Sequence, residues 1–400
     1  MTKLDRLIAE FCPDGVEFGT IGDIGDVCMC KRIFKEQTQP IGDVPFFKIG
    51  TFGKEPDAYI SQGLYDEYVS KYSFPNVGDI LISAAGTIGR TVIYYGEPAY
   101  FQDSNIVWVA NDESKLLNRF LFYLYTLNPW AVSTGGTISR LYNDNKRKAK
   151  IPFPPLSIQR EIVRILDNFT ELTAELTAEL TARKIQYEFY RNELLTFGDD
   201  VPMVTLSQCC KSIADGDHQA PPKTDGGIPF ITISNVSKLN QIDFTDTRFV
   251  PETYYNNLDC KRKAQTNDIL YTVVGSFGIP VLIDSDMKFA FQRHIAILRP
   301  DCKAILSKYL FYALQSYDFL NQANAAAVGA AQRTITLTAL NKMKIPLPSL
   351  AEQERIVSIL DRFDTLTTDI TSGLPAEIAA RQKQYEYYRN KLLTFEEAKI

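Results

Sequence analysis

The sequence predicts an α+β fold with two related domains, each a small twisted β-sheet with helices, separated by two long antiparallel α-helices that form a coiled coil. Three observations indicate this fold. First, the chain has 400 residues, which is too many for a single ordinary hydrophobic core. Second, a long repeat runs through the sequence. Third, the best-preserved part of this repeat has heptad spacing. We predict the first domain at residues 1–150, the first helix at 151–198, the second domain at 199–344 and the second helix at 345–400.

The repeat is strongest in two stretches that follow the domains. Ile151–Phe169 returns 194 residues later as Ile345–Phe363, and Gln186–Phe197 returns 198 residues later as Gln384–Phe395. The domains themselves match more weakly but in the same order. Since one part of the repeat has diverged and the other has not, we interpret the chain as two variable domains on a constant frame. Uneven drift for packing reasons is the alternative.

Each domain mixes short β-branched and aromatic runs with glycine-rich turns and one helix-like stretch, at Leu116–Leu127 and at Ile305–Leu320. This mixture predicts an α+β domain with a twisted sheet. The Gly86–Gly89 and Gly275–Gly278 loops are too short and wrongly spaced for a phosphate-binding or dinucleotide-binding loop. We therefore interpret them as turns.

Both copies of the constant segment are predicted to be long helices. After a proline-rich lead Ser157 can cap the first helix, and its apolar residues then recur every four and three residues, with one phase shift of the kind that a four-residue stutter produces. The seam residues of the first helix are Ile158, Ile162, Ile165, Phe169, Leu172, Leu176, Leu180, Tyr187, Tyr190, Leu194 and Phe197. Those of the second helix are Ile356, Ile359, Phe363, Leu366, Ile370, Tyr385, Tyr388, Leu392 and Phe395. Ser372–Pro375 is predicted to break or kink the second helix.

A long helix with one apolar stripe is not stable alone in water. We therefore expect the two copies to pair antiparallel, with one domain at each end. The alternative is that each helix folds back on its own domain. Residues 171–182 form three tandem Glu-Leu-Thr-Ala units, each about 6 Å long as helix. These units either adjust the distance between the domains or are a slippage repeat on a solvated helix.

Composition excludes several classes of protein. The formal net charge of −5 argues against a sequence-independent nucleic-acid coat, so any DNA binding must be local. Basic clusters occur at Arg140 with Lys146–Lys150 and at Lys261–Lys263. The longest apolar run, Phe120–Leu127, is too short to span a bilayer, and the N-terminus lacks the apolar segment of a signal peptide. We predict a cytoplasmic protein without a membrane segment.

No metal site and no catalytic site is predicted. The seven cysteines lack C-x-x-C spacing, which argues against a zinc site. Only two histidines occur, so few residues are available for a histidine metal site or a Ser-His-Asp triad. His218 lies in an Asp-Gly-Asp-His segment, which favours a turn over a metal ligand. Asn128-Pro-Trp130 is not the Asn-Pro-Pro-aromatic motif that a methyltransferase needs. The alternatives to a non-catalytic DNA-binding module are a stand-alone methylase or nuclease fusion and a coiled-coil scaffold for proteins only.

Polar side chains that suit base edges cluster where the two domains differ. Asn and Gln suit adenine, and Arg and Lys suit guanine. The candidates in the first domain are Lys48, Thr51, Lys54, Gln102, Ser104, Asn105, Ser139 and Arg140. The candidates in the second domain are His218, Gln219, Lys223, Thr232, Ser234, Asn235, Gln292, Arg293, His294 and Arg333. Only their clustering carries weight, because each alone is more often an ordinary surface residue.

The chain carries, twice each, an Ile-Pro-x-Pro-x-Leu-x-x-Gln lead, an Ile-Val-x-Ile-Leu-Asp-x-Phe helix and a Gln-Tyr-Glu-aromatic-Tyr-Arg-Asn-x-Leu-Leu-Thr-Phe close. In these motifs and in its doubled arrangement it resembles type I restriction enzyme specificity subunits, and the resemblance covers essentially the whole chain. It implies two target recognition domains, each of which reads one half of a bipartite, asymmetric site in double-stranded DNA, with the helices as spacer. The tetrapeptide repeat is similar to a spacer-length element of this family.

The resemblance also implies partners. Two modification subunits would dock on the helices and supply S-adenosylmethionine-dependent adenine methylation, and ATP-dependent restriction subunits that translocate and cleave DNA would join them. S-adenosylmethionine, ATP and Mg²⁺ would be bound by these partners, with no cofactor in this chain. The residues expected in the spacer and partner-docking helices are Ile162, Ile165, Phe169, Leu172, Leu176, Tyr187, Tyr190, Leu194, Ile356, Ile359, Phe363, Leu366, Tyr385, Tyr388 and Leu392. Base-contacting positions do not transfer, because they vary with the recognised sequence.

Overall fold

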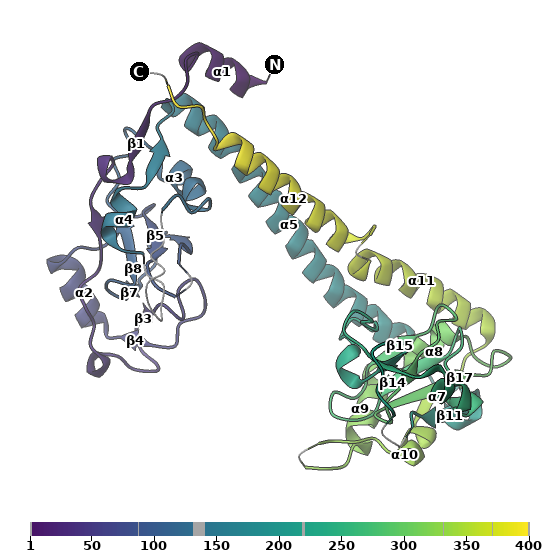
Figure 1. Cartoon of the computed structure of the whole chain (residues 1–400). Coiled ribbons are helices and arrows are strands. Elements are labelled where there is room, and N and C mark those ends of the chain that lie inside the picture. Colours follow the sequence, from purple (N-terminus) through teal and green to yellow (C-terminus); the bar gives the residue numbers. More distant parts are fainter. Residues whose placement is uncertain are drawn as a thin grey trace. The chain divides into compact units, whose positions relative to one another are not determined.

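The structure is a computed structural model that describes residues 2–86, 88–130, 141–217, 221–330, 332–369 and 371–398. The chain forms two compact units. Unit 1 comprises Met1–Glu175 and Ala379–Ile400, and unit 2 comprises Leu176–Ile378. Each unit therefore combines one domain with the start of the helix that follows it and with the end of the helix from the other copy. Helices α5 (Leu156–Leu194) and α12 (Leu374–Leu392) contribute to both units (Figure 1).

Within its described residues, the domain of unit 1 contains three small sheets and four short helices. The four-stranded sheet has the order β2 (Val27–Cys28), β8 (Ile106–Val109), β5 (Ile80–Ser83) and β6 (Thr91–Ile93). The three-stranded sheet has the order β4 (Tyr59–Ile60), β3 (Val44–Phe47) and β7 (Tyr100–Phe101), and β1 (Phe18–Thr20) pairs with β9 (Lys150–Pro152). The helices are α1 (Lys3–Phe11), α2 (Gln62–Lys71), α3 (Asn118–Tyr125) and α4 (Asn143–Arg147).

Unit 2 repeats this sheet arrangement. Its four-stranded sheet has the order β11 (Cys210–Asp215), β17 (Ile295–Pro300), β14 (Ile269–Thr272) and β15 (Pro280–Leu282). The smaller sheets are β13 (Arg248–Val250), β12 (Ile228–Ile231) and β16 (Ala290–Phe291), and the pair β10 (Met203–Thr205) and β18 (Lys344–Pro346). The remaining helices are α6 (Leu206–Cys209), α7 (Glu252–Asn257), α8 (Ser307–Ala313), α9 (Tyr317–Ala326), α10 (Leu337–Lys342) and α11 (Leu350–Thr368).

The equivalence of the two domains extends to strand direction and burial. In both units one pair in the three-stranded sheet is parallel, with Phe46 opposite Tyr100 and Phe230 opposite Ala290. The central strands β5 and β14 are buried along their whole length, and alternate side chains enter different apolar clusters because successive residues of a strand face opposite sides. The prediction of two equivalent α+β domains is confirmed.

The first turns of each long helix pack on the domain that precedes it. Ile158, Ile162 and Leu166 are fully buried in the core of unit 1, and Ile356 and Leu360 are fully buried in the core of unit 2. Ile158 and Ile162, two predicted seam residues, are thus part of the core of unit 1, and the same cluster includes Leu393 just after α12. The start of each long helix folds onto its own domain, as the alternative interpretation expected.

Further along, the two copies pair as predicted. In unit 1 the rings of Phe169 and Tyr388 stack with centroids 5.4 Å apart. In unit 2 the ring of Phe363 stacks on Tyr187 at 6.2 Å and on Tyr190 at 5.6 Å. Within unit 1, α5 and α12 lie side by side and run in opposite directions, as α5 and α11 do within unit 2 (Figure 1). The antiparallel pair is confirmed.

The helix ends differ between the copies. Ser349 caps α11, since its hydroxyl accepts a hydrogen bond from the Glu352 amide at 3.3 Å. Pro155 occupies the equivalent position before α5, which begins at Leu156, so the prediction that Ser157 caps this helix is wrong. The predicted break is confirmed, because α11 ends at Thr368 and α12 begins at Leu374. The predicted seam residue Ile370 lies outside the described residues, and no helix within the described part of the chain could cross a membrane.

Candidate nucleic-acid interface and its helical frame

The glutamine of the repeated lead joins the start of α5 to unit 1. Gln159 is fully buried. Its side-chain oxygen accepts a hydrogen bond from the Leu117 amide at 2.8 Å, and its side-chain nitrogen donates to the carbonyl oxygens of Lys115 at 2.9 Å and Pro154 at 2.7 Å. These three backbone groups lie just before α3 and just before α5. One side chain thus satisfies polar groups that would otherwise be buried without partners.

Gln353 makes the same contacts in unit 2. Its oxygen accepts from the Leu306 amide at 2.9 Å, and its nitrogen donates to the carbonyl oxygens of Ala304 at 3.2 Å and Pro348 at 2.9 Å. Gln353 is also fully buried. The two glutamines therefore have one structural role, which explains why this position is identical in both copies.

The aspartate of the Ile-Leu-Asp motif forms a second attachment. Asp167 accepts hydrogen bonds from the Tyr123 hydroxyl at 2.5 Å and from the Arg119 guanidinium at 2.7 Å. Asp361 accepts from the Tyr312 hydroxyl at 2.7 Å and from a lysine of α8. Burial, followed by the bond to the carboxylate, raises the pKa of both tyrosines, so both remain protonated donors at neutral pH. The repeated motif residues thus bind each helix to its domain and to the other helix.

Two of the polar candidates for base reading, Gln102 and Gln292, lie at equivalent positions directly after β7 and β16. The backbone N–H of Gln102 donates to the Phe47 carbonyl oxygen at 3.0 Å, and the backbone N–H of Gln292 donates to the Ile231 carbonyl oxygen at 2.9 Å. The side-chain oxygen of Gln102 also accepts from the Ile49 amide at 2.9 Å. Each glutamine is therefore the first residue of a loop, and a backbone hydrogen bond to the adjacent strand, β3 or β12, holds the start of that loop in place.

Four of the candidates of unit 1 line two pockets. Lys48 and Gln102 line one of about 530 Å³, where the Lys48 ammonium pairs with Asp57 at 2.8 Å. Ser104 and Asn105 line the other, of about 330 Å³. The nearby Thr51 hydroxyl bonds to the backbone of its own loop, and Lys54 is exposed. Ser139 and Arg140 lie outside the described residues.

The candidates of unit 2 differ in exposure. Arg293, Lys223 and Ser234 are exposed, whereas His294 is half-buried and burial lowers its pKa. The Thr232 hydroxyl bonds to that of Ser234 at 2.7 Å. Arg333 donates to Asn324 and lies over the ring of Phe277 at 5.2 Å. His218 and Gln219 lie outside the described residues.

Asn235 is a correction to the predicted set. It is only 7% exposed. Its side-chain oxygen accepts from the Thr232 amide at 3.0 Å, and its nitrogen donates to the carbonyl oxygens of Asp243 at 3.2 Å and Asp246 at 2.9 Å. Asn235 therefore holds a turn together and does not present its amide to solvent, a role that its residue type alone does not reveal.

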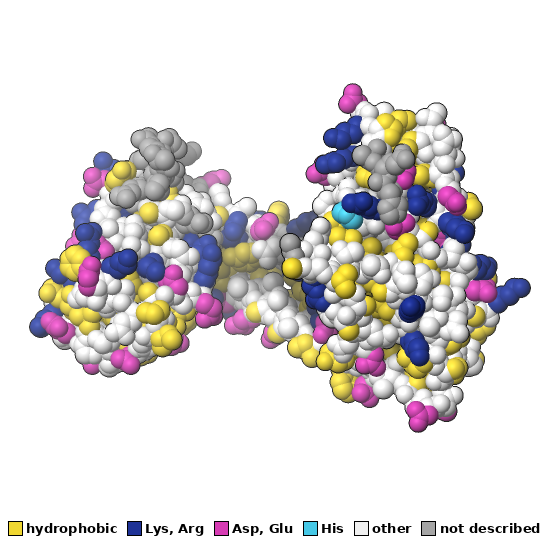
Figure 2. All heavy atoms as spheres, turned by 90° about the horizontal axis from the view of Figure 1, so that it is seen from below, with side chains coloured by type: hydrophobic (Ala, Val, Ile, Leu, Met, Phe, Trp, Pro, Cys, Tyr) yellow, Lys and Arg dark blue, Asp and Glu magenta, His cyan; other side chains and the backbone are white. Residues whose placement is uncertain are grey.

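The two basic clusters are less basic at the surface than the sequence suggests. Lys146 is 1% exposed, and burial lowers its pKa to about 8. Arg262 lies 3.7 Å from Asp215 and 3.4 Å from Asp217, which neutralise it. On the surfaces visible in Figure 2, Lys and Arg side chains are interspersed with Asp and Glu. Any phosphate contact must therefore come from local groups of basic residues.

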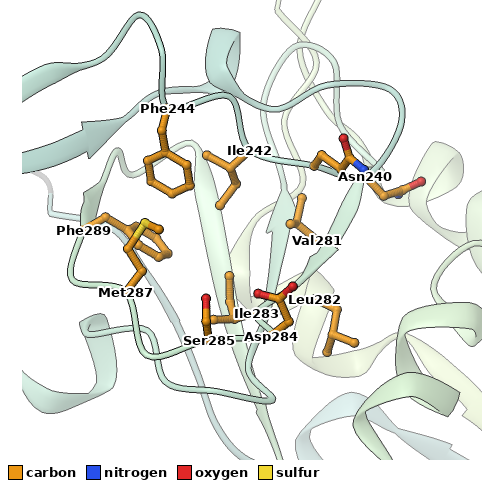
Figure 3. Close-up of a pocket in the computed structure, with 11 residues that line it drawn as sticks. Asn240, Ile242, Phe244, Val281, Leu282, Ile283, Asp284, Ser285, Met287 and Phe289 are labelled. Atoms are coloured by element: carbon orange, nitrogen blue, oxygen red, sulfur yellow. The ribbon is translucent and has the colours of Figure 1, made fainter. Parts of the chain in front are cut away.

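A pocket in unit 2, with both apolar and polar side chains in its lining, was not predicted from the sequence. It has a volume of about 310 Å³. Ile242, Phe244, Val281, Met287 and Phe289 surround it, and they come from β15 and the loops beside it (Figure 3). Its lining comes from two separate segments, residues 240–244 and 281–289, which only the tertiary structure brings together.

Two domains of one topology, each with an equivalent polar loop and attached to a repeated helical frame, define a modular binding protein. The family model "Type I restriction modification DNA specificity domain" matches this chain twice, at residues 13–183 and 200–380. The chain therefore belongs to the type I restriction-modification DNA specificity family.

Individual relatives agree with this assignment. A putative type I restriction enzyme specificity subunit of Haemophilus influenzae is 58% identical over 44% of this chain and 47% of its own length, so this match spans about half of that relative. The EcoR124I/EcoR124II specificity subunit of Escherichia coli is 36% identical over 71% of this chain and 72% of its own.

Solved structures show the same fold. A chain from a structure of the type I restriction-modification system aligns with a TM-score of 0.62 at 18% identity, over 95% of this chain and 98% of that one. The specificity subunit of Mycoplasma genitalium aligns with a TM-score of 0.53 at 16% identity, over 95% and 96%.

Proposed function

We propose that this chain is the DNA sequence-specificity subunit of a type I restriction-modification complex, in which each unit reads one half of a bipartite, asymmetric site in double-stranded DNA. The observation that carries the proposal is the family match to both halves of the chain, on a frame whose attachments are the same in both units. This match favours the specificity role over the alternatives of a methylase or nuclease fusion and a protein scaffold.

The loops after β7 and β16 support different readings by the two units. A hydrogen bond from Ile106 to Gln102 closes the first loop at 3.1 Å, and one from Ile295 to Gln292 closes the second at 3.0 Å. Between these ends the first loop holds Asp-Ser-Asn and the second holds Arg-His. Arginine suits guanine and asparagine suits adenine in the major groove. An asymmetric DNA site requires that the two domains present different hydrogen-bond donors and acceptors from equivalent loops.

Mapping of methylated adenines in cells that carry this chain and its modification subunit tests the proposal. We expect one bipartite, asymmetric motif with an unread spacer. Arg293→Ala is expected to relax the preference in only one half-site, with a loss of about 1–3 kcal/mol of discrimination at one base pair. Arg6→Ala on α1, an exposed arginine, is the control. A continuous motif, or relaxation of both half-sites by Arg293→Ala, would contradict the proposal.

The partner-docking surface is proposed on the outward side of the helix ends. Phe189 is 58% exposed and the equivalent Tyr387 is 61% exposed, although both are large aromatic residues. Beside them Arg183 donates to a glutamine at 2.9 Å, and Arg381 does so at 3.1 Å. Exposed aromatic residues mark protein interfaces, so two such surfaces fit two modification subunits.

Several residues of the predicted spacer and partner-docking helices belong to the spacer frame. Tyr187 is 8% exposed and packs in the core of unit 2, while Leu194 and Leu392 pack against the cores of units 2 and 1. These three residues hold the frame together. The heptad pattern identified them because it marks whatever side of a helix is buried, and it cannot tell a structural contact from an interface.

Phe189→Glu and Tyr387→Glu are each expected to remove one modification subunit from the complex, and the double variant to remove both. A charge placed in an apolar interface would lose its hydration without gaining a partner. The mass of the assembled complex, measured by native mass spectrometry, reports the loss. Tyr95→Glu, at a tyrosine 66% exposed in the first domain, is the matched control. Full assembly by the double variant would exclude this surface.

The proposal assigns no chemistry to this chain. Adenine methylation with S-adenosylmethionine is assigned to the modification subunits, and ATP- and Mg²⁺-dependent translocation and cleavage to restriction subunits. Membership of a specificity family supports this division, as well as assembly with other restriction-modification subunits. We place the complex in the cytoplasm, where its DNA substrate lies.

The Glu-Leu-Thr-Ala units are proposed to set the length of the unread spacer. Residues 171–182 lie in α5, which is helical throughout. Leu172 and Leu176 are half-buried, whereas the glutamates and alanines of the repeat are exposed. Because the units form regular helix, a change in their number changes the helix by about 6 Å per unit, close to two base pairs of B-DNA.

A further inference from the structure

Two connections join the same pair of helix contacts. One contact is Phe169 with Tyr388 in unit 1, and the other is Phe363 with Tyr190 in unit 2. The first connection runs along α5 over 21 residues (169 to 190), and the second runs along α11 and α12 over 25 residues (363 to 388). Because both begin and end at these contacts, they share one end-to-end length, whatever that length is.

The second connection is therefore too long by four residues. Four residues are about 6 Å of helix, or slightly more than one turn. Two uninterrupted helices could not satisfy both contacts with this difference. The structure interrupts only the longer connection, between Thr368 and Leu374, whereas α5 continues without a break.

Residues within the interruption between α11 and α12 stabilise the non-helical conformation there. Asp369 accepts hydrogen bonds from the Thr371 amide at 2.7 Å and from its hydroxyl at 2.6 Å, and bonds from Ser372 and Thr371 lower the pKa of Asp369 to about 2. A side chain at Gly373 would clash with the carbonyl oxygens of Thr365 and Asp369. Pro375 lies in the first turn of α12, where no amide donor is needed.

We propose that the interruption between Thr368 and Leu374 is a length-compensating element. It takes the four surplus residues out of the helical path, so that the shorter helix alone sets the separation of the two contacts. The number of Glu-Leu-Thr-Ala units in α5 can then change while both ring contacts persist. This inference concerns the folding of the frame and holds whether or not α5 sets a DNA spacing.

The proposal predicts how length changes combine. One added unit after Ala182 brings α5 to the length of the second connection, and the interruption can be drawn out to match. Deleting residues 370–373 together with Pro375→Ala instead shortens the second connection to the length of native α5 and permits one continuous helix. Either change alone keeps the two lengths compatible. Both together leave the second connection four residues too short, with no interruption left to extend.

Thermal unfolding of the four full-length chains tests this. Each single change is expected to shift the Tm by less than about 3 °C, whereas the combination is expected to lower it by more than about 8 °C. Insertion of Gly-Ser-Gly-Ser after Gly198 in place of the added unit is the control and is expected to be additive with the deletion. Additive effects of the added unit and the deletion would overturn the proposal.

A second measurement keeps the test informative if the deletion variant does not fold. Gly373→Ala is expected to lower the Tm of the native chain, because the added methyl group meets the Thr365 and Asp369 carbonyl oxygens. In the chain with the added unit the drawn-out segment relieves this clash, so the same substitution is expected to cost less than half as much. An equal loss in both chains would contradict the proposal. Neither measurement involves DNA, so its failure is distinct from failure of the spacer function.

Discussion

Gln353→Leu is expected to lower the free energy of unfolding of unit 2 by about 3 kcal/mol. The substitution nearly preserves volume but leaves the Leu306 amide and two carbonyl oxygens buried without partners, and each such group costs about 1–3 kcal/mol. Some of this cost would be recovered by relaxation and entry of water. Hydrogen exchange of the amides in β14 and α8 would report the stability of this unit separately from the rest of the chain.

Gln159→Leu is the equivalent change in unit 1 and is expected to have an effect of the same size there, since it removes the same three bonds. Gln241→Leu, at an exposed glutamine of unit 2, is the control and should change stability by less than about 0.5 kcal/mol. If Gln353→Leu behaved like this control, the buried glutamine would not be the attachment between helix and domain.

Deleting Glu175–Ala178 is expected to shorten the unread spacer of the methylated motif by one or two base pairs and to leave both half-sites intact. The deletion removes about 6 Å of α5, whereas neither domain loses a residue. Mapping of methylated adenines in cells that carry the variant measures the change. The native α5 is already the shorter connection, so this variant should also be less stable than one with an added unit.

Replacing residues 175–178 with four alanines is the matched control, because it changes the sequence of one unit but keeps the helix length. We expect the spacer to remain unchanged in this variant. The addition of a unit should lengthen the spacer by one or two base pairs. An unchanged spacer after deletion, or altered half-sites, would mean that the tandem units are a slippage repeat without a measuring role.

Much of the frame was predictable because its signals are local or repeated. The duplication required two equivalent domains, and the heptad spacing placed Phe169 and Phe363 among the residues that join the helices, where the structure finds them. The break before Leu374 followed from Gly373 and Pro375, whose backbone preferences act within a few residues.

The sequence by itself determined that the chain is a duplication with a constant helical frame, because repeats and apolar periodicity are visible without knowledge of distant contacts. Only the tertiary structure decided which surface each apolar side meets. Ile162 is fully buried in the core of unit 1, whereas Phe169 is only partly buried and stacks on Tyr388 of the other helix, although both obey one spacing. Burial of Lys146 and of Asn235 was decided in the same way. Periodicity records that a side chain is buried, whereas its partner depends on residues brought close by the fold of the whole unit.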